Sequence, residues 1–338
     1  MLSTIKNIFR VLLPFAFGAG ILWWMYRGTN WTEFGQVLAN KVKWNWMLFS
    51  LLFGILPQII RALRWKQALQ PLGEKPRTRT AIDSIFLSYA SSLIIPRIGE
   101  VTRCGTLKNY DSTSFTKSIG TVVTERIVDS LTMLLLTGIT FLCQLPLFFK
   151  FLNTTGTTLD GFLARFTTTG YVVTGLCVIG LVLLAALLFW RFKAFSKGKD
   201  VLMSVWSGIL SLKGVKNIPL YIFYSFAIWI CYFLHFYLAF FCFDFTAAFS
   251  PMAAFFIFCI GSFAVLVPTP NGAGPWHFAV KTMLVLYGVR EADAVMFALV
   301  VHTVQTALVV FLGVYAWIDL NFLKRMPQVN AEKQKELT

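Results

Sequence analysis

Two apolar segments of the sequence are interrupted by a proline that is followed by polar residues. Residues 95–103 read IPRIGEVTR, and residues 267–275 read VPTPNGAGP. Lipid offers no hydrogen-bond partner to a broken backbone, so such breaks are tolerated at membrane depth only where they face protein or a water-filled cavity. A matched pair of breaks in the two halves of a chain is typical of transporters with a site near the bilayer midplane.

The composition indicates a protein that crosses a membrane several times. Of its 338 residues, 57% are hydrophobic and only 13% are charged, a balance that excludes a soluble domain of this size. The chain has 30 Lys and Arg against 15 Asp and Glu, and these cations lie in short loops between apolar stretches. Such loops are typical of the cytoplasmic side of a membrane protein, and they argue against nucleic-acid binding.

The sequence predicts an all-α polytopic membrane protein. A spanning helix needs about 20 mostly apolar residues. Six full transmembrane helices are predicted at 8–26, 44–63, 119–145, 170–190, 219–243 and 294–317. Two shorter apolar stretches are predicted to form broken, re-entrant helical hairpins: 81–96 with the polar stretch to 115, and 253–268 with 276–289.

The predicted elements occur in the same order twice: two spans, a broken hairpin and a third span. The loops richest in Lys and Arg place both termini in the cytoplasm by the positive-inside rule. The two hairpins then enter from opposite faces, which predicts an inverted repeat of about 5–146 and 168–322. Both repeats belong to one membrane domain, 1–325, followed by a short polar cytoplasmic tail, 326–338.

Six charged residues gather near the first break and the third long span. They are Arg97, Glu100, Arg103, Glu125, Arg126 and Asp129. The first three follow the break at intervals of three and would share a broad face of a helix. Each charge at the centre of a membrane helix costs about 2.5–3.5 kcal/mol. The six must therefore pair, reach the interface or face a wet cavity.

Two interpretations of this cluster stay open. The arginines could hold the phosphate of a headgroup, because guanidinium offers a planar fork of donors. The acids could then balance them, bind an amine or carry a proton. Alternatively, the residues could be salt bridges that only orient the hairpin, or interfacial charges that reach into the headgroup region. Arg61 and Arg64, which end the second span, are interpreted mainly as topological anchors.

The second half is less charged, and its polar residues lie around the second break. Its two glycines would permit backbone conformations that a Cβ forbids, and their N–H groups could face an anion. Each histidine could bind substrate or be a hydrogen-bonded packing residue. The candidate binding residues added here are Pro270, Asn271, Gly272, Gly274, His277 and His302.

No motif of a soluble enzyme is present: the sequence has no phosphate-binding loop, dinucleotide fingerprint, zinc-spaced His/Cys set or GxSxG serine. The six cysteines are scattered, mostly within apolar runs, which predicts buried packing rather than redox or metal chemistry. We therefore expect no cofactor, no metal and no enzymatic activity, with membrane lipid as the partner.

Residues 96–103, Glu125-Arg126 with Asp129, and residues 268–274 resemble signature stretches of the lysylphosphatidylglycerol synthase transmembrane-region family, also called flippase-like. The resemblance extends from about residue 5 to 325. It implies a multi-pass bacterial inner-membrane protein with two re-entrant elements, whose best-known relatives move aminoacylated phospholipid between leaflets. The functional residues that it implies are the six charged residues above and the turn 270–274.

The sequence departs from this family in two ways. The soluble aminoacyl-transfer domain of the long members is absent, so the chain is not expected to make the lipid itself. His277 stands where an acidic residue is expected, which argues against specificity for the lysyl lipid.

We therefore predict a lipid flippase that moves a phospholipid or another lipid-linked anionic headgroup between leaflets through a charged midplane cavity. Two alternatives stay open: a membrane-embedded transferase acting on a polyprenyl phosphate or a phospholipid, and a non-transporting scaffold. The lipid, the direction of transport, the energy coupling and the formation of a homo-oligomer are not readable from the sequence.

Overall fold

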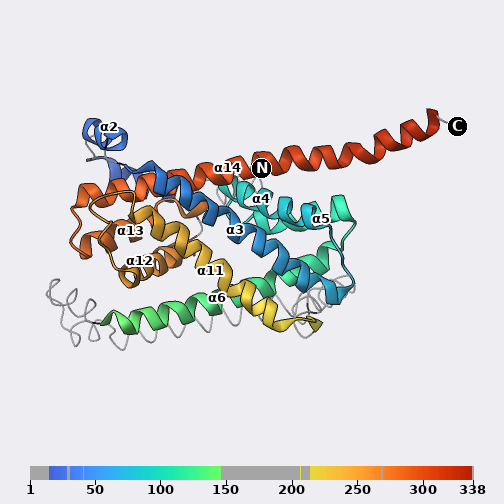
Figure 1. Cartoon of the computed structure of the whole chain (residues 1–338), viewed down its shortest axis with the longest axis horizontal. Coiled ribbons are helices and arrows are strands. Elements are labelled where there is room, and N and C mark those ends of the chain that lie inside the picture. Colours follow the sequence, from blue (N-terminus) through green and yellow to red (C-terminus); the bar gives the residue numbers. More distant parts are fainter. Residues whose placement is uncertain are drawn as a thin grey trace, which may run out of the picture.

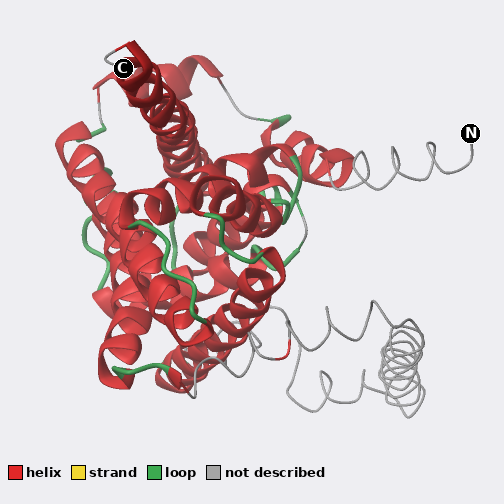
Figure 2. Ribbon diagram, turned by 90° about the vertical axis from the view of Figure 1, so that its right-hand side faces the viewer, coloured by secondary structure: helices red, strands yellow, loops and turns green. Residues whose placement is uncertain are grey.

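The structure is a computed structural model that describes residues 15–28, 31–40, 42–145, 206, 214–267 and 269–336. Over these ranges the chain is helical with short connecting loops and no strand (Figure 2). The predicted all-α class is confirmed. The predicted span 170–190 lies outside the described residues, as do Pro268 and the beginning of the span 8–26.

Within the described ranges, four helices are long and apolar enough to cross a membrane. They are α3 (Trp44–Leu69), α6 (Phe115–Cys143), α11 (Ile218–Phe240) and α14 (Glu291–Glu336). These helices correspond to the second, third, fifth and sixth predicted spans. Of the first predicted span the structure describes the shorter apolar helix Phe15–Tyr26, which is followed by α2 (Trp31–Asn40). The count of six spans therefore stays a prediction.

Two of the spanning helices continue past their predicted ends. α3 extends to Leu69 rather than residue 63, because its basic last turns are buried among other helices instead of facing water; the 3-10 turn η1 (Gln70–Leu72) follows it. α14 extends to Glu336, so most of the predicted polar tail is helical, and this part projects beyond the bundle in Figure 1.

Each predicted broken hairpin is a pair of helices joined by a tight connection. α4 (Thr78–Ile94) meets α5 (Gly99–Asp111) at residues 95–98, and α12 (Pro251–Ala264) meets α13 (Pro275–Leu286) through η3 (Pro270–Gly272). All four helices are shorter than the about 20 residues that a span requires. Figure 1 shows α4 and α5 toward one end of the bundle and α12 and α13 toward the other.

The first connection is tight because α5 begins directly against α4. A Cβ on Gly99 would lie 2.1 Å from the Ser88 carbonyl oxygen and 2.5 Å from Ser92 Oγ, so only glycine fits. The Gly99 N–H donates to Ser92 Oγ over 3.2 Å. Arg97 adopts a left-handed φ of 64°, which turns the chain back along α4. The polar residues that follow Pro96 are thereby returned to the inside of the bundle.

The second connection is held by left-handed residues as well. Asn271 has φ 52° and Gly274 has φ 91°, conformations that asparagine and glycine tolerate best. Gly274 precedes the first residue of α13 and packs on the helix Phe15–Tyr26, where an added Cβ would lie 2.9 Å from the Gly18 carbonyl oxygen. The second break is thus placed against the first helix of the chain.

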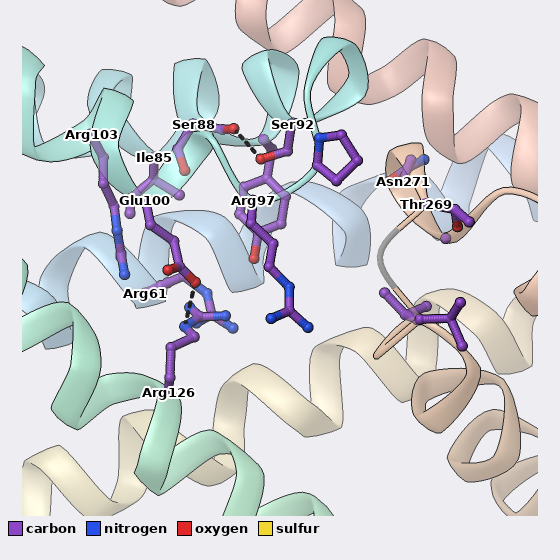
Figure 3. A pocket seen from close by; sticks show the side chains of 15 residues that line it. Arg61, Ile85, Ser88, Ser92, Arg97, Glu100, Arg103, Arg126, Thr269 and Asn271 are labelled. Atoms are coloured by element: carbon purple, nitrogen blue, oxygen red, sulfur yellow. Dashed lines mark hydrogen bonds and ion pairs between the residues drawn. The ribbon is translucent and has the colours of Figure 1, made fainter. Parts of the chain in front are cut away.

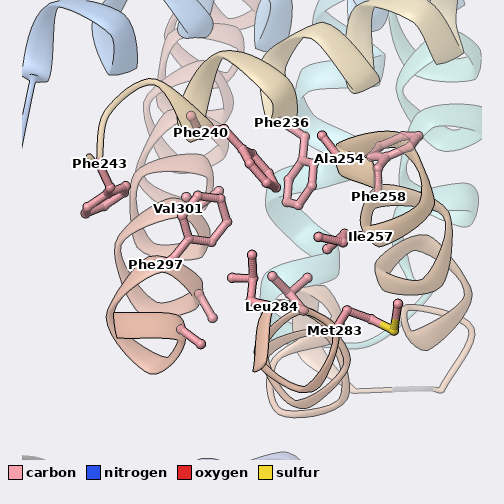
Figure 4. Packing of buried hydrophobic residues seen from close by; sticks show 14 of the residues in the cluster. Phe236, Phe240, Phe243, Ala254, Ile257, Phe258, Met283, Leu284, Phe297 and Val301 are labelled. Atoms are coloured by element: carbon pink, nitrogen blue, oxygen red, sulfur yellow. The ribbon is translucent and has the colours of Figure 1, made fainter. Parts of the chain in front are cut away.

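An aromatic core holds α12 and α13 against α11 and α14 (Figure 4). The rings of Phe240 and Phe297 are 4.9 Å apart in an edge-on arrangement, and Phe236 lies between Phe297 and Phe258. Fully buried alanines such as Ala254 and Ala298 let the helices approach closely. In a bilayer this close packing, rather than exclusion of water, stabilises helix association.

A second core holds α4 and α5 against α3 and α6. Trp65 of α3 is 1% exposed, packs in this core and donates from its indole N–H to Thr121 Oγ1 of α6 over 2.8 Å. In addition, α4 packs on α14 and α12 contacts α6, so spanning helices of both halves of the chain hold each helical pair. The connections of both pairs point toward the middle of the bundle (Figure 1).

Candidate functional site: an arginine-rich cavity between two helical breaks

Both breaks line the same cavity, which has a volume of about 220 Å³ (Figure 3). Pro96 and Arg97 contribute from the first break, and Asn271 and Gly272 from the second. Arg97 Nη2 donates to the Leu266 carbonyl oxygen over 3.1 Å, so the two connections are in direct contact. Segments that are 169 residues apart in the sequence thus form one site.

The remaining charged residues of the cavity wall come from three helices. α3 supplies Arg61, α5 supplies Glu100 and Arg103, and α6 supplies Arg126. Glu100 Oε1 lies 3.7 Å from Arg126 Nε, and both side chains are partly exposed, at 38% and 43%. In the part of the chain that the structure describes, the cavity wall therefore presents four arginines, Arg97 included, and one carboxylate.

Glu125 lies behind the cavity and holds three of these arginines in place. Its Oε1 is 2.5 Å from Arg61 Nη1 and 2.8 Å from Arg126 Nη2, and its Oε2 is 3.0 Å from Arg103 Nη1. The Glu125 side chain is only 3% exposed. A buried carboxylate is tolerated when paired in this way, because each guanidinium replaces the water that burial removes.

Asp129 lies one helical turn further along α6 and pairs with α3. Its Oδ2 is 2.6 Å from Arg61 Nη1, and its Oδ1 is 2.7 Å from Arg64 Nη2. Arg64 Nη1 also donates to Ser225 Oγ of α11 over 3.0 Å, and the Arg64 guanidinium lies 5.6 Å from the ring centre of Tyr221. The ion network thereby links α3, α6 and α11.

The interpretation of Arg61 and Arg64 mainly as topological anchors is wrong. Their side chains are 4% and 1% exposed and pair with Glu125 and Asp129. The sequence held a signal for this pairing: two arginines at i, i+3 on one apolar span and two acids at i, i+4 on another. Each pair occupies one face of its helix, so two such faces can meet.

Arg97 and Arg103 retain donors that face no acceptor. Among the described residues Arg97 pairs with no carboxylate, and it precedes α5 instead of sharing a helical face with Glu100 and Arg103 as predicted. Arg103 is 2% exposed, and its Nε and Nη2 have no hydrogen-bond partner in the described ranges. The Arg103 guanidinium lies 4.7 Å from the ring centre of Trp65. Arg97 is exposed and lines the cavity, so an anion there would accept from its guanidinium.

The polar residues of α4 were missed by sequence reasoning. Ser88 and Ser92, at i, i+4, line the cavity together with Tyr89, whose hydroxyl is 2.8 Å from the Tyr232 hydroxyl of α11. Their spacing places one polar face on an otherwise apolar helix, which was the available signal. Buried Thr269 lines the cavity from the opposite side.

The two histidines face a different groove. Its volume is about 660 Å³, it is mainly apolar, and Pro270, Asn271, His277 and His302 contribute to its wall. The two imidazole rings are 4.3 Å apart. His302 Nε2 is 3.1 Å from the Asn271 carbonyl oxygen, and the Gly274 N–H donates to His277 Nδ1 over 3.4 Å. Both histidines thus hydrogen-bond to the backbone of the second break, and they line a groove separate from the arginine-rich cavity.

The cysteines are mostly packing residues where they are described. Cys104, Cys231, Cys242 and Cys259 are buried, whereas Cys143 is exposed at the end of α6. Cys177 lies outside the described residues. No group of three or more His, Cys, Asp or Glu side chains with metal-binding proximity occurs in the described ranges.

Fold and site together define a helical, multi-pass membrane protein in which two interrupted helical pairs enclose a charged cavity. The profile of the family described as lysylphosphatidylglycerol synthase TM region matches residues 11–313. The chain therefore belongs to this family, as its signature stretches predicted, and membership indicates a lipid-related function in a membrane. No curated protein and no solved structure gave a significant match.

Proposed function

We propose that the protein is a flippase-like lipid transporter. The anionic headgroup of a membrane lipid passes between leaflets through the arginine-rich cavity, while the hydrocarbon chains stay in the bilayer. The observation that supports this most directly is the single cavity that joins both helical breaks and carries four arginines on its wall. Family membership supports the link to lipid.

Charge complementarity is the physical basis of this proposal. An anionic headgroup that leaves water for hydrocarbon loses its hydration at a cost of several kcal/mol or more. The exposed guanidinium of Arg97 offers N–H donors that replace water around such a group. Because Glu125 holds Arg61, Arg103 and Arg126 in place, the positive charge of the wall keeps its position without the anion.

The rim of the cavity suits the chains of a lipid. Val265 and Val267 line the cavity and are 46% and 37% exposed. Ile94 and Leu266, next to the two connections, are 69% and 59% exposed. Aliphatic side chains exposed beside a charged cavity fit a ligand with a polar head and apolar tails.

In the proposed architecture α4–α5 and α12–α13 are re-entrant and related by an inverted repeat, within six full spans. Their positions toward opposite ends of the bundle (Figure 1) support access to the cavity from both membrane faces. We place the protein in a bacterial inner membrane with both termini in the cytoplasm, from the distribution of Lys and Arg. Transport, rather than chemical conversion of the lipid, is its proposed activity.

The test is leaflet exchange in reconstituted vesicles. The full chain in phosphatidylcholine vesicles, with traces of fluorescent phosphatidic acid and phosphatidylglycerol, should accelerate exchange of at least one of them over protein-free vesicles. Arg97→Asn, which suits the left-handed backbone, should slow exchange about tenfold or more, the loss of one charge-assisted hydrogen bond. Arg27→Gln removes the same charge from an exposed position outside the cavity and serves as the matched control.

Three results would overturn the proposal. Exchange no faster than in protein-free vesicles, for every anionic lipid tested, would leave the scaffold alternative. A modified lipid product, formed by the purified protein from a labelled donor, would identify a transferase instead. Equal rates for wild type and Arg97→Asn would show that the cavity is not the path.

A further inference from the structure

We infer that the headgroup is a phosphomonoester, a lipid whose terminal phosphate carries two negative charges, rather than a diester or an amine-bearing headgroup. This inference rests on the proposed function and names the substrate class of the same cavity (Figure 3). Three features of the site support it: the net charge of the cluster, the pairing of its carboxylates with arginines, and the placement of its arginines on different elements.

The cluster carries two positive charges in excess. Five arginines stand against three acids, and the acids are Glu100, Glu125 and Asp129. A phosphomonoester carries about −1.5 to −2 charges at neutral pH, whereas a diester carries one. In a partly desolvated cavity an uncompensated charge is costly, so the ligand that neutralises the cluster is favoured. A dianion matches the excess, and a diester leaves one positive charge unpaired.

Most carboxylate oxygens of the cluster are already paired with arginines, so few remain to bind a cation. Both oxygens of Glu125 and both oxygens of Asp129 already lie 2.5–3.0 Å from guanidinium nitrogens. Among the described residues, Glu100 is the one carboxylate that lines the cavity, and Arg126 lies beside it. An amine-bearing headgroup would therefore meet four guanidiniums for one acid. This arrangement disfavours an aminoacylated lipid on electrostatic grounds.

The arginines of the cavity wall come from different elements. Arg97 extends from the first connection, Arg103 from α5, Arg126 from α6 and Arg61 from α3 (Figure 3). A monoester presents three free oxygens in a tetrahedral arrangement, which can accept from several directions at once. A diester has two free oxygens, and its second substituent would have to share a cavity of about 220 Å³.

Binding, measured separately from transport, tests the inference. The full chain, purified in nanodiscs of phosphatidylcholine, is titrated with short-chain phosphatidic acid, phosphatidylglycerol, lysyl-phosphatidylglycerol and inorganic phosphate, and occupancy is read by native mass spectrometry. Phosphatidic acid should bind about tenfold or more tightly than phosphatidylglycerol, the factor expected from one further charge-assisted hydrogen bond. The lysyl lipid should bind no better than phosphatidylglycerol.

The variant Glu100→Gln distinguishes a site for a phosphomonoester from a site for an amine-bearing headgroup. The isosteric change raises the net charge of the cluster from +2 to +3 and should tighten phosphatidic acid binding severalfold. If Glu100 instead held an amine, the same variant would weaken binding of the lysyl lipid and leave phosphatidic acid unchanged. Arg97→Asn should weaken phosphatidic acid binding about tenfold, and the exposed control Arg27→Gln should not change it.

Equal affinity for phosphatidic acid and phosphatidylglycerol, or a weaker phosphatidic acid complex in Glu100→Gln, would overturn the inference. Equal affinity for inorganic phosphate and phosphatidic acid would show a site for the free ion. Selective monoester binding without leaflet exchange would leave the inference standing and remove the transport proposal. Equal exchange of monoester and diester lipids without selective binding would overturn the inference and leave the transport proposal standing.

Discussion

Removing the charge of Glu125 should destabilise the fold more than any other isosteric change in the ion network. Its carboxylate contacts Arg61, Arg103 and Arg126 at 2.5–3.0 Å, and its side chain is 3% exposed. Breaking a buried pair by removing one partner costs about 3–5 kcal/mol, because the remaining charges stay buried without compensation. Glu125→Gln leaves three arginines around a neutral amide whose own N–H donors point at them. We therefore expect a loss in the free energy of unfolding of about 3–5 kcal/mol.

The matched control is Glu100→Gln, the same chemical change at a partly exposed residue of α5. Glu100 is 38% exposed and has one ion contact, at 3.7 Å, so its replacement should cost less than about 1 kcal/mol. Unfolding of the detergent-solubilised protein by denaturant, followed through tryptophan fluorescence, measures both variants against wild type. A cost for Glu125→Gln no larger than that for Glu100→Gln would refute the reasoning.

A double-mutant cycle tests whether the contact between Arg103 and Glu125 itself contributes to stability. Arg103 pairs with Glu125 over 3.0 Å, and among the described residues it has no other carboxylate partner. The double variant Glu125→Gln/Arg103→Gln should therefore cost less than the sum of the two single changes, by about 1 kcal/mol or more. Additive costs would show that the short contact contributes nothing to stability.

Two further predictions concern the packing that positions the cavity. Gly99→Ala should lower the free energy of unfolding by about 1–3 kcal/mol or more, because its Cβ would lie 2.1 Å from the Ser88 carbonyl oxygen. On the same helix a Cβ added at Gly105 would have no neighbour within 4 Å, so Gly105→Ala should be neutral or stabilising by up to about 1 kcal/mol. Equal effects of the two glycine substitutions would contradict the close approach of α5 to α4. Phe297→Ala should cost about 3–5 kcal/mol in the same denaturant assay, because Phe297 is fully buried, while Phe311→Ala, 72% exposed, should cost little.

The helical pairs and the four described spanning helices were predictable because hydropathy and chain breaks are local properties. Residues 95–103 and 267–275 indicated two interrupted pairs, and the structure has helices ending and restarting at both places. Arg126 and Asp129, three residues apart on α6, lie 3.6 Å from each other, a contact within one helix turn. Helix ends were less accurate: α3 runs on because its basic last turns find partners inside the bundle.

Partners on different helices were not predictable in this way. Arg61 and Arg64 looked like charges at a span end, since their acids lie more than 60 residues away on α6. Which face of α3 meets which face of α6 depends on helix rotation and tilt, and these follow from packing around Trp65 and Thr121. The same reason explains why His277 and His302 line a separate groove instead of the charged cavity.

The order of residues alone therefore established a membrane protein, two broken helical pairs and an unusual concentration of charge, because each of these depends on neighbours within a few turns. The meeting of the two breaks depended on tertiary packing, as shown by the contact of Arg97 with the Leu266 carbonyl oxygen. So did the division of the charged residues into a paired interior around Glu125 and an arginine-lined wall. A charged residue can be identified from the sequence, but its ionic partner depends on which helices pack beside it.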